Sequence, residues 1–385
     1  MPKERVVVAM SGGVDSALAA ARLVDEGYDV VGVTLHLWDY PDRGQKGRCC
    51  APEDQYDARR VADHLGVPHY TFDRRELFAR EVVRGFVDAY LEGQTPSPCV
   101  SCNRTVKLRE LLPIADRLGA RYVATGHYAR VVRHGGATYL ARGADPQKDQ
   151  AYFLYMLRPD ELDRLVLPLG GSLKPEVRAE ALARGLPGAD KGESQELCFV
   201  GDEGYAEFVA RRADGRVRPG RILGPAGEVV GQHEGLHKFT IGQRKGLGVA
   251  LGQPAFVVAL DASDGSVRLG SEAELAAEGA LLAPDFALTY PERDAELPAA
   301  VIQVRARHGG AAGRLSLDGS GRALVHFDEP VRAVSPGQVA VLYSEDGRVL
   351  GGGTIEAPIR GASSGVEPEG RTVGEAERAP REQRA

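Results

Sequence analysis

Two features of this sequence contain residue types that carry out chemistry: a serine- and glycine-rich loop near the N-terminus, and three cysteines farther along the chain. The loop spans residues 11–16, reads SGGVDS, and follows a run of valines that is typical of a buried strand. Glycines let backbone N–H groups approach an anion, and a helix that starts directly after the loop adds a favourable partial positive charge. The loop is neither a Walker A motif, because no Gly-Lys-Ser/Thr follows, nor a Gly-x-Gly-x-x-Gly dinucleotide fingerprint. It therefore predicts a phosphate-binding loop of another class.

The three cysteines are Cys99, Cys102 and Cys198. Cys99 and Cys102 lie three residues apart in a proline-rich turn, which is predicted to lead into a helix at residue 104. A helix N-terminus lowers the pKa of a thiol and makes it more nucleophilic. Cys198 stands between a leucine and a phenylalanine, so it is either a buried apolar side chain or a third reactive thiol.

Metal binding is a competing interpretation of these thiols. Structural zinc normally takes four ligands as two spaced pairs, and Cys49 and Cys50 are adjacent, so a four-cysteine zinc ribbon is not favoured. Cys99, Cys102 and Cys198 could instead hold an iron–sulfur cluster that keeps one position open. Thiol chemistry and a cluster both remain open at this point, and Cys49 and Cys50 are expected to be loop thiols without a chemical role.

Strand-like and helix-like segments alternate through the first half of the chain. Strands are expected at residues 6–10, 29–37, 69–72 and 122–125, and helices at 15–26, 54–65, 104–118 and 175–185. This alternation predicts an α/β domain whose parallel sheet is covered by helices on both faces.

The pattern changes near residue 214, where glycines become frequent and short strand-like runs dominate. Runs at 300–304, 323–327 and 339–343 indicate a small β-barrel or sandwich. The expected domains are a nucleotide-binding α/β domain at 1–213, a small β-rich linking domain at 214–279 and a C-terminal β-barrel at 280–360. Residues 361–385 have only Ala and Val as apolar types and are expected to form a disordered tail.

The composition excludes several classes of protein. The 385 residues are 43% hydrophobic and 26% charged, as in an ordinary globular enzyme, and no apolar run approaches the ~18 residues of a membrane helix. The N-terminus has no secretory apolar region, and five cysteines in so long a chain do not resemble a disulfide framework. We therefore expect a cytoplasmic protein without a membrane partner. The net charge of -6 argues against a uniformly basic nucleic-acid coat but leaves room for a local basic patch.

Taken together, the motifs resemble the bacterial tRNA-specific 2-thiouridylase family (MnmA/TrmU), over about residues 4–357. The matching motifs are residues 10–16 (MSGGVDS), 95–98 (TPSP), 102–103 (CN), 124–128 (ATGHY), 148–155 (KDQAYFLY), 198–199 (CF) and 242–248 (GQRKGLG). The resemblance implies a PP-loop domain of the adenine-nucleotide alpha-hydrolase type, a small β-rich domain and a C-terminal β-barrel. It also implies a sulfurtransferase that uses ATP to thiolate C2 of the wobble uridine, U34, in tRNAs for Lys, Glu and Gln.

The resemblance assigns roles to individual residues. Cys198 would carry a persulfide delivered by a sulfur-relay protein or a cysteine desulfurase, and Cys102 would be the nucleophile, ending in a Cys102–Cys198 disulfide. ATP, with Mg²⁺ beside Asp15, would bind Ala9, Met10, Ser11, Gly12, Gly13, Val14, Asp15, Ser16, Leu35 and Gly126. The anticodon region of the tRNA would contact Ser97, Pro98, Cys99, His127, Lys148, Asp149, Gln150, Arg305, Ala306 and Gln338.

One position departs from a well-known version of the family, which has Asp where this chain has Cys99. If that carboxylate acts as an acid or a base, this chain lacks it, and a [4Fe-4S] cluster on Cys99, Cys102 and Cys198 is an alternative to the persulfide route. Two other functions also stay open: a pyrophosphate-loop synthetase or amidotransferase for a small molecule, and an RNA-binding scaffold with an inactive nucleotide site. The paired thiols and the β-barrel argue against the first, and the intact loop at 11–16 argues against the second.

Overall fold

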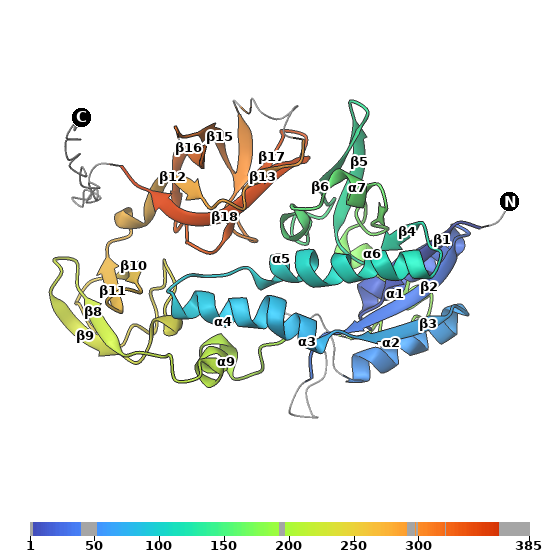
Figure 1. Cartoon of the computed structure of the whole chain (residues 1–385), viewed down its shortest axis with the longest axis horizontal. Helices are drawn as coiled ribbons and strands as arrows, with labels where there is room; N and C mark the ends of the chain where they lie inside the picture. Colours follow the sequence, from blue (N-terminus) through green and yellow to red (C-terminus); the bar gives the residue numbers. More distant parts are fainter. Residues whose placement is uncertain are drawn as a thin grey trace, which may run out of the picture.

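A computed structural model describes residues 3–39, 52–191, 197–290, 297, 299–319 and 321–361 of the chain. Cys49, Cys50 and, apart from Gly361, the predicted tail lie outside these residues. The described chain forms a five-stranded α/β unit, a four-stranded β unit and a closed β-barrel (Figure 1), which confirms the predicted fold class. In these ranges no helix has both the length and the apolar character that crossing a membrane requires.

The α/β unit is built on a parallel sheet in the order β3-β2-β1-β4-β7. Alternate side chains of the central strand β1 (Arg5–Ala9) face opposite sides, because Val7 belongs to one apolar cluster and Val6 and Val8 belong to another. A strand that is buried on both faces is characteristic of a parallel sheet. The other strands are β2 (Asp29–His36), β3 (His69–Asp73), β4 (Tyr122–Ala124) and β7 (Leu165–Val166).

Helices cover both faces of this sheet. One face carries α1 (Val14–Asp25), α2 (Pro52–Leu65) and α8 (Lys174–Ala183). The other face is covered by apolar side chains of α9 (Gly204–Arg212) and of the helical segments between β3 and β4. The chain runs outward from β1 through β2 to β3 and then returns to place β4 on the other side of β1. The strand order therefore reverses at β1, and the crevice beyond the carboxyl ends of β1 and β4 is the expected position for a ligand.

One long helical rod crosses the second face of the sheet (Figure 1). It consists of α5 (Pro98–Cys102), a π-helical turn η2 (Asn103–Lys107) and α6 (Leu108–Arg117). The prediction that this helix starts at residue 104 was wrong, because Ser97 at the N-cap and Pro98 at the first helical position begin it six residues earlier. Cys99 and Cys102 therefore lie in the first turns of the helix. A second rod contains α3 (Arg75–Phe78), the π-helical turn η1 (Ala79–Val83) and α4 (Arg84–Leu91).

A hairpin that the sequence analysis did not identify joins the α/β unit to the barrel. It consists of β5 (Ala129–His134) and β6 (Ala137–Arg142), with positive φ angles of 55° and 77° at Gly135 and Gly136. Tyr139 of β6 is buried in the apolar cluster of the barrel. Two short helical segments, η3 (Ala151–Leu154) and α7 (Pro159–Leu162), follow this hairpin, whereas η4 (Leu236–Lys238) belongs to the four-stranded β unit.

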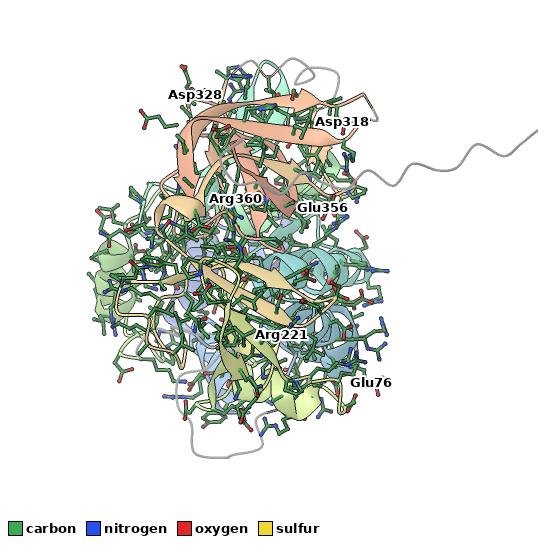
Figure 2. All side chains as sticks on the ribbon, turned by 90° about the vertical axis from the view of Figure 1, so that its left-hand side faces the viewer. Glu76, Arg221, Asp318, Asp328, Glu356 and Arg360 are labelled. Atoms are coloured by element: carbon green, nitrogen blue, oxygen red, sulfur yellow. The ribbon has the colours of Figure 1, made fainter. Side chains whose placement is uncertain are left out.

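The C-terminal sheet closes into a barrel because β12 pairs with both β16 and β18. Its strands are β12 (Ala276–Leu282), β13 (Ala287–Leu288), β14 (Ala300–Gln303), β15 (Ala311–Leu317), β16 (Ala323–Arg332), β17 (Val339–Tyr343) and β18 (Val349–Ile359). The middle unit contains β8 (Gly220–Leu223), β9 (Val229–His233), β10 (Phe256–Asp261) and β11 (Ser266–Gly270), and η5 (Ala273–Leu275) links it to β12. Arg360 joins these two parts, because its guanidinium donates to the Val258 carbonyl at 3.0 Å (Figure 2).

The barrel rests directly on the rod that carries the cysteines. Val339 and Val341 of β17 share an apolar cluster with Val100 of α5 and Leu108 of α6. In addition, the Tyr152 hydroxyl donates to the Val339 carbonyl at 3.0 Å. The position of the cysteine-bearing helix thus depends on the barrel as well as on the α/β unit.

Candidate active site

A cavity of about 210 Å³ opens at the carboxyl ends of β1, β2 and β4, where the strand order reverses. Most of the residues predicted to bind ATP line it, namely Ala9, Met10, Ser11, Asp15, Ser16, Leu35 and Gly126. Of the other three, Gly12 and Gly13 form the turn before α1, and Val14 is the first residue of that helix. The cavity is therefore bounded by the segment that the sequence marks as a phosphate loop.

Hydrogen bonds within the loop hold it against the start of α1. The Ser16 hydroxyl donates to the Gly13 carbonyl at 2.9 Å and accepts a hydrogen bond from the Ser11 backbone N–H at 3.1 Å. The Ser11 and Ser16 hydroxyl oxygens lie 3.3 Å apart. Because the first N–H groups of a helix have no partner within it, this fixed helix start beside a cavity is suited to phosphate.

Two glycines allow neighbouring backbones to approach the loop closely. Gly12 has a φ of +78°, and a Cβ there would lie 2.2 Å from the Asp54 carbonyl oxygen. A Cβ on Gly126 would lie 2.8 Å from the Asp15 and Ser16 backbones. Any larger residue at either position would displace the loop or the start of α1, which explains why both are glycine.

Two side chains from distant parts of the chain hold the carboxylate of Asp15. Lys174 Nζ donates to its two oxygens at 2.6 and 2.8 Å, and the Tyr128 hydroxyl donates to Oδ1 at 2.7 Å. The Lys174 ammonium also lies 5.6 Å from the centre of the Tyr128 ring. Lys174 thus places a positive charge beside Asp15 in the phosphate loop. In a Walker A motif, a lysine of the loop itself supplies such a charge.

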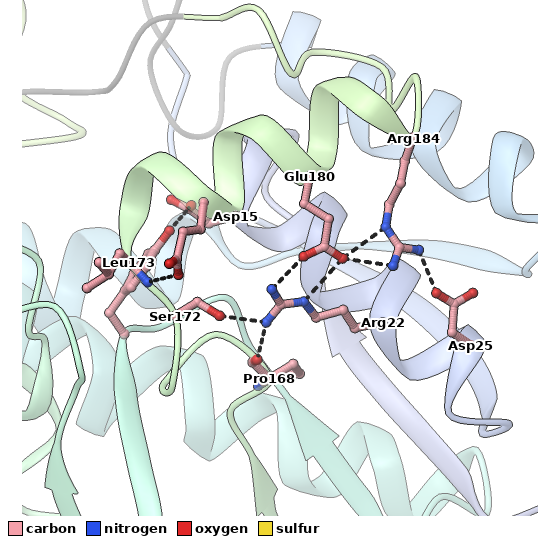
Figure 3. A network of polar contacts seen from close by, with 10 residues as sticks. Asp15, Arg22, Asp25, Pro168, Ser172, Leu173, Glu180 and Arg184 are labelled. Atoms are coloured by element: carbon pink, nitrogen blue, oxygen red, sulfur yellow. Dashed lines mark hydrogen bonds and ion pairs between the residues drawn. The ribbon is translucent and has the colours of Figure 1, made fainter.

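Lys174 is the first residue of α8, and ion pairs hold α8 against α1 (Figure 3). Arg22 of α1 donates to Glu180 of α8 at 2.6 Å, and Arg184 of α8 pairs with Asp25 of α1 at 2.5 Å. The sequence analysis did not identify Lys174 as a site residue. The only signal was its place at a predicted helix start, since its partner Asp15 lies 159 residues away in the sequence.

The segment after β4 supplies another wall of the cavity. His127 Nδ1 pairs with the Thr125 hydroxyl at 2.8 Å. Gln150 holds Tyr128 in place, because its Oε1 accepts a hydrogen bond from the Tyr128 N–H at 2.9 Å and its own N–H donates to the Tyr128 carbonyl at 2.8 Å. His127 and Gln150, which were predicted to contact tRNA, therefore line the same cavity as the predicted ATP residues.

Burial, reinforced by the nearby Lys107 ammonium, lowers the pKa of His127 to about 3. A histidine in the unfolded chain titrates near pH ~6.5, so the unfolded state binds this proton more strongly and folding stability falls as the pH drops below about 6.5. The loss is at most about 1.4 kcal/mol per pH unit, down to the lowered pKa. We expect His127→Gln, which does not titrate, to flatten the dependence of the unfolding free energy on pH in urea titrations at mildly acidic pH. Identical pH dependence in the two proteins would contradict a buried neutral imidazole.

The two thiols predicted to handle sulfur lie on one apolar cluster. Cys102 is 5% exposed inside this cluster, and Cys198 packs against it with intermediate exposure. Phe199 anchors the Cys198 segment, because its ring centre lies 5.5 Å from that of Phe78 and 5.1 Å from that of Phe86. Cys99, in contrast, is exposed to solvent.

The described side chains do not form the three-thiol cluster site that was the alternative for these cysteines. Among the described residues, no three or more His, Cys, Asp or Glu side chains are grouped so as to hold a metal ion. Cys99 is exposed whereas Cys102 is buried in the core. Asp15, which was predicted to lie beside Mg²⁺, is bound by Lys174.

Each of the three parts of the chain matches a known family model. The family models that match are the tRNA methyl transferase HUP domain over residues 4–202, the tRNA methyl transferase PRC-barrel domain over 206–271 and the aminomethyltransferase beta-barrel domain over 279–355. The tRNA-specific 2-thiouridylase MnmA of Sorangium cellulosum is 63% identical over 363 residues, which cover 92% of this chain and 93% of that protein. The chain belongs to the tRNA-specific 2-thiouridylase MnmA family.

More distant relatives agree with the MnmA assignment. The tRNA-specific 2-thiouridylase MnmA of Geobacter metallireducens is 45% identical over 363 residues, which cover 93% of this chain and 98% of that protein. A solved 4-thiouridine synthetase–RNA complex with bound ATP matches with a TM-score of 0.34 and 16% identity over 55% of this chain and 51% of that one. A likeness that low supports no functional inference, so the assignment to the MnmA family depends on the sequence relatives.

Asp149, one of the predicted tRNA contacts, has its carboxylate turned to the protein. Its Oδ1 accepts hydrogen bonds from the Gly143 and Ala151 N–H groups at 2.9 and 3.1 Å, and its Oδ2 pairs with Arg142 at 3.0 Å. These contacts fasten the end of β6 to the segment that follows. The neighbouring Lys148 is partly exposed.

The predicted tRNA contacts in the barrel follow β14. Gln303 is buried, and its amide donates to the carbonyl oxygens of Arg305 and Ala306 at 3.2 and 3.1 Å. The Arg305 guanidinium donates to the Arg332 carbonyl at 3.1 Å. Arg305 is partly exposed and Ala306 is exposed, so this turn has a fixed shape at the surface of the barrel.

The barrel also holds the chain directly before α5. Gln338 Nε2 donates to the Thr95 carbonyl at 2.7 Å, and the Thr95 N–H donates to the Pro336 carbonyl at 2.8 Å. A Cβ on Gly337 would lie 3.0 Å from the Thr95 nitrogen, so the two segments are in close contact. Gln338 thus holds the approach to the helix that carries Cys102, and this contact uses the side chain that was predicted to bind tRNA.

We expect Gln338→Ala to lower the rate of sulfur transfer by about tenfold, because a small displacement of a reacting group has a large effect on rate. The KM for ATP should stay unchanged, since the phosphate loop is fastened elsewhere. Single-turnover thiolation and the ATP dependence of pyrophosphate release measure the two effects separately. Gln232→Ala, at an exposed glutamine of β9, is the control. A variant whose only defect is in the KM for ATP would contradict this positioning role.

Proposed function

We propose that this protein thiolates C2 of the wobble uridine in tRNAs for Lys, Glu and Gln, at the expense of ATP. The C2 oxygen of the uridine attacks the α-phosphorus of ATP, and pyrophosphate leaves. The terminal sulfur of a Cys198 persulfide then attacks C2, and the C2–O bond breaks as AMP leaves. The Cys102 thiolate attacks the Cys198 sulfur, which breaks the S–S bond, leaves sulfur on the base and forms the Cys102–Cys198 disulfide. A thiol reductant then supplies the two electrons that regenerate both thiols.

The observation that carries this proposal is that a single helical rod connects the two halves of the reaction. Lys107 of η2 lines the phosphate cavity, and Cys102 lies five residues before it on the same rod. Five helical residues span roughly 7.5 Å along the axis. A uridine between them would lie within reach of both the α-phosphate and the thiol, as adenylylation followed by sulfur transfer requires.

In this proposal, the phosphate loop and its neighbours have separate roles in the first step, the adenylylation of the uridine. The N–H groups at the start of α1 and the hydroxyls of Ser11 and Ser16 bind phosphate oxygens. Lys174, in contact with Asp15, balances the negative charge that builds up as pyrophosphate departs. Leu35 and Gly126 bound the nucleotide from β2 and from the segment after β4.

No step of this reaction scheme is assigned to a metal ion held by protein side chains. Mg²⁺ that enters with ATP is held mainly by phosphate oxygens and water, and the contacts of Asp15 leave it paired with Lys174. Among the described residues, the cysteines are not grouped as the ligands of a shared iron–sulfur cluster would be. Persulfide transfer between Cys198 and Cys102 is therefore the route that we propose.

In this proposal, the enzyme has two macromolecular partners in the cytoplasm, the tRNA and a protein that donates sulfur. A target base in the anticodon loop must leave its stack to reach the cavity, so the tRNA is bound over a wide surface that includes the residues before α5 and the turn after β14. The sulfur comes from a relay protein or a cysteine desulfurase that reaches Cys198, a residue with intermediate exposure.

An assay with an unmodified tRNA transcript tests this function. The protein is incubated with the tRNA, ATP and a persulfide donor, and the nucleosides are analysed by mass spectrometry for the exchange of one oxygen for sulfur. We expect equal amounts of AMP and thiolated uridine, and neither product without tRNA. Release of AMP with a small-molecule acceptor alone would favour the synthetase alternative, and tRNA binding without pyrophosphate release would favour the scaffold.

A further inference from the structure

A second cavity, of about 590 Å³, lies between the cysteine-bearing rod and the barrel. Arg104, Arg109 and Leu112 of the rod form one wall, and Asp285 and Leu288 of the barrel side form the opposite wall. Tyr155 and Arg158, from the segment after η3, complete it. Apart from Tyr155, which ends the 148–155 motif, none of these residues belongs to the motifs singled out in the sequence, and none lines the phosphate cavity.

The charged groups of this groove that could still bind a ligand are guanidiniums. Arg104 and Arg109 are both exposed, and neither guanidinium pairs with any residue in the part of the chain that the structure describes. The acids of the groove already have partners: Asp285 accepts hydrogen bonds from the Thr354 N–H and hydroxyl at 2.9 and 2.7 Å, and Glu161 accepts one from the Arg158 N–H at 2.9 Å.

Tyr155 supplies a second, independent sign of a missing ligand. Its side chain is 4% exposed, and within the described residues its hydroxyl has no hydrogen-bond partner. Buried hydroxyl groups in proteins are normally hydrogen-bonded, so this one calls for an external oxygen or nitrogen. Within the described residues, the groove therefore combines two guanidiniums that have no ion-pair partner with a hydroxyl that has no hydrogen-bond partner.

We propose that this groove binds the phosphodiester backbone of the tRNA next to the anticodon, through Arg104 and Arg109. The proposal rests on the thiolation function given above. Arg104 and Arg109 follow Cys102 by two and seven residues on the same rod, so along its axis both lie within about two helical turns of that thiol, on the side of the rod that lines the groove. Guanidinium groups bind phosphate oxygens in a bidentate manner. Such contacts would account for RNA binding by a protein whose net charge is -6.

The test measures tRNA binding to the full-length protein as a function of salt. Arg104→Ala and Arg109→Ala should each raise the Kd for an unmodified tRNA transcript about tenfold near physiological salt. Each should also reduce the slope of log Kd against log salt concentration by about one, as expected for one lost phosphate contact. Lysine at either position should restore most of the slope. Arg59→Ala, at an exposed arginine of α2 outside the groove, is the matched control and should change neither quantity.

The outcomes separate this proposal from the proposed function. If the wild-type protein thiolates tRNA but the Arg104/Arg109 double alanine variant binds it with unchanged Kd and slope, the groove proposal is wrong and the function stands. If the wild-type protein does not thiolate tRNA in the presence of ATP and a persulfide donor, the function itself fails. Melting temperatures control for misfolding and should change little, because both arginines are exposed and neither has a hydrogen bond or ion pair with another described residue. A third outcome would also overturn the proposal. If millimolar inorganic phosphate competed with tRNA but neither arginine variant changed the Kd for tRNA, the groove would be a site for small anions.

Discussion

Cys102→Ala and Cys198→Ala each abolish thiolation of tRNA, by on the order of 10³-fold or more, while pyrophosphate release continues. This result is expected because, in the proposed reaction, the thiols act only after adenylylation and the phosphate loop lies on the other side of the uridine. Alanine is the better test at Cys102, because it keeps the apolar character of this buried cluster, whereas serine would bury an additional hydroxyl group. Parallel assays of thiolated uridine and of pyrophosphate on the same samples measure the two steps.

Cys99 provides the matched control for these variants. It lies on the same helix as Cys102 but is exposed, so Cys99→Asp should retain activity within a few fold. This substitution also recreates the other pattern known in the family. If Cys99→Asp were inactive and had lost bound iron that the wild-type protein contained, a cluster mechanism would replace the persulfide route. If Cys102→Ala still released thiolated tRNA, the assignment of Cys102 as nucleophile would be wrong.

Lys174→Ala should lower the rate of adenylylation by on the order of 10²-fold, since it removes a preorganised cation from the place where pyrophosphate leaves. Among the described residues, it also leaves the Tyr128 hydroxyl as the remaining side-chain partner of the Asp15 carboxylate. The folding stability should fall by no more than about 1 kcal/mol, because the Asp15 side chain is 34% exposed and solvent screens the pair. ATP–pyrophosphate exchange in the presence of tRNA measures the rate, and tRNA binding should not change.

Two further variants separate a direct role of Lys174 from a merely structural one. Arg184→Ala removes a cation from the far end of the same helix, where it pairs with Asp25 and Glu180, and should leave the exchange rate unchanged. The double variant Asp15→Ala/Lys174→Ala should lose less than the sum of the two single losses in free energy, because the two residues contact each other. If the losses were fully additive, the pair would not act as a unit.

The parts of this molecule that local sequence determines were predictable. The strand, loop and helix around residues 11–16 are adjacent in the chain, so glycine spacing and apolar periodicity were enough to place the phosphate loop. The alternation of later segments likewise predicted the parallel sheet. The hairpin β5–β6 was missed even though Gly135-Gly136 is a strong turn signal, because the motifs around it drew the interpretation to ligand contacts.

The parts that long-range packing determines were not predictable. Lys174 contacts Asp15 only because the α1–α8 ion pairs bring two helices together, and no local pattern records this. Gln338 lies 243 residues from Thr95, whose carbonyl it holds. The predicted start of the cysteine-bearing helix was wrong for a different reason. The proline-rich sequence of residues 95–98 indicated a turn, although Pro98 is well suited to a first helical position.

The contact between β17 and the cysteine-bearing rod has a consequence for how this protein can evolve. Val339 and Val341 are part of the same core as Val100 and Leu108, so a chain that ended before the barrel would expose that core to water. The barrel is therefore a component of the catalytic unit and not an appended module that recombination could exchange freely. A chimera that takes its barrel from a relative would have to take the facing side of the rod with it, and substitutions on the two surfaces are expected to occur as compensating pairs.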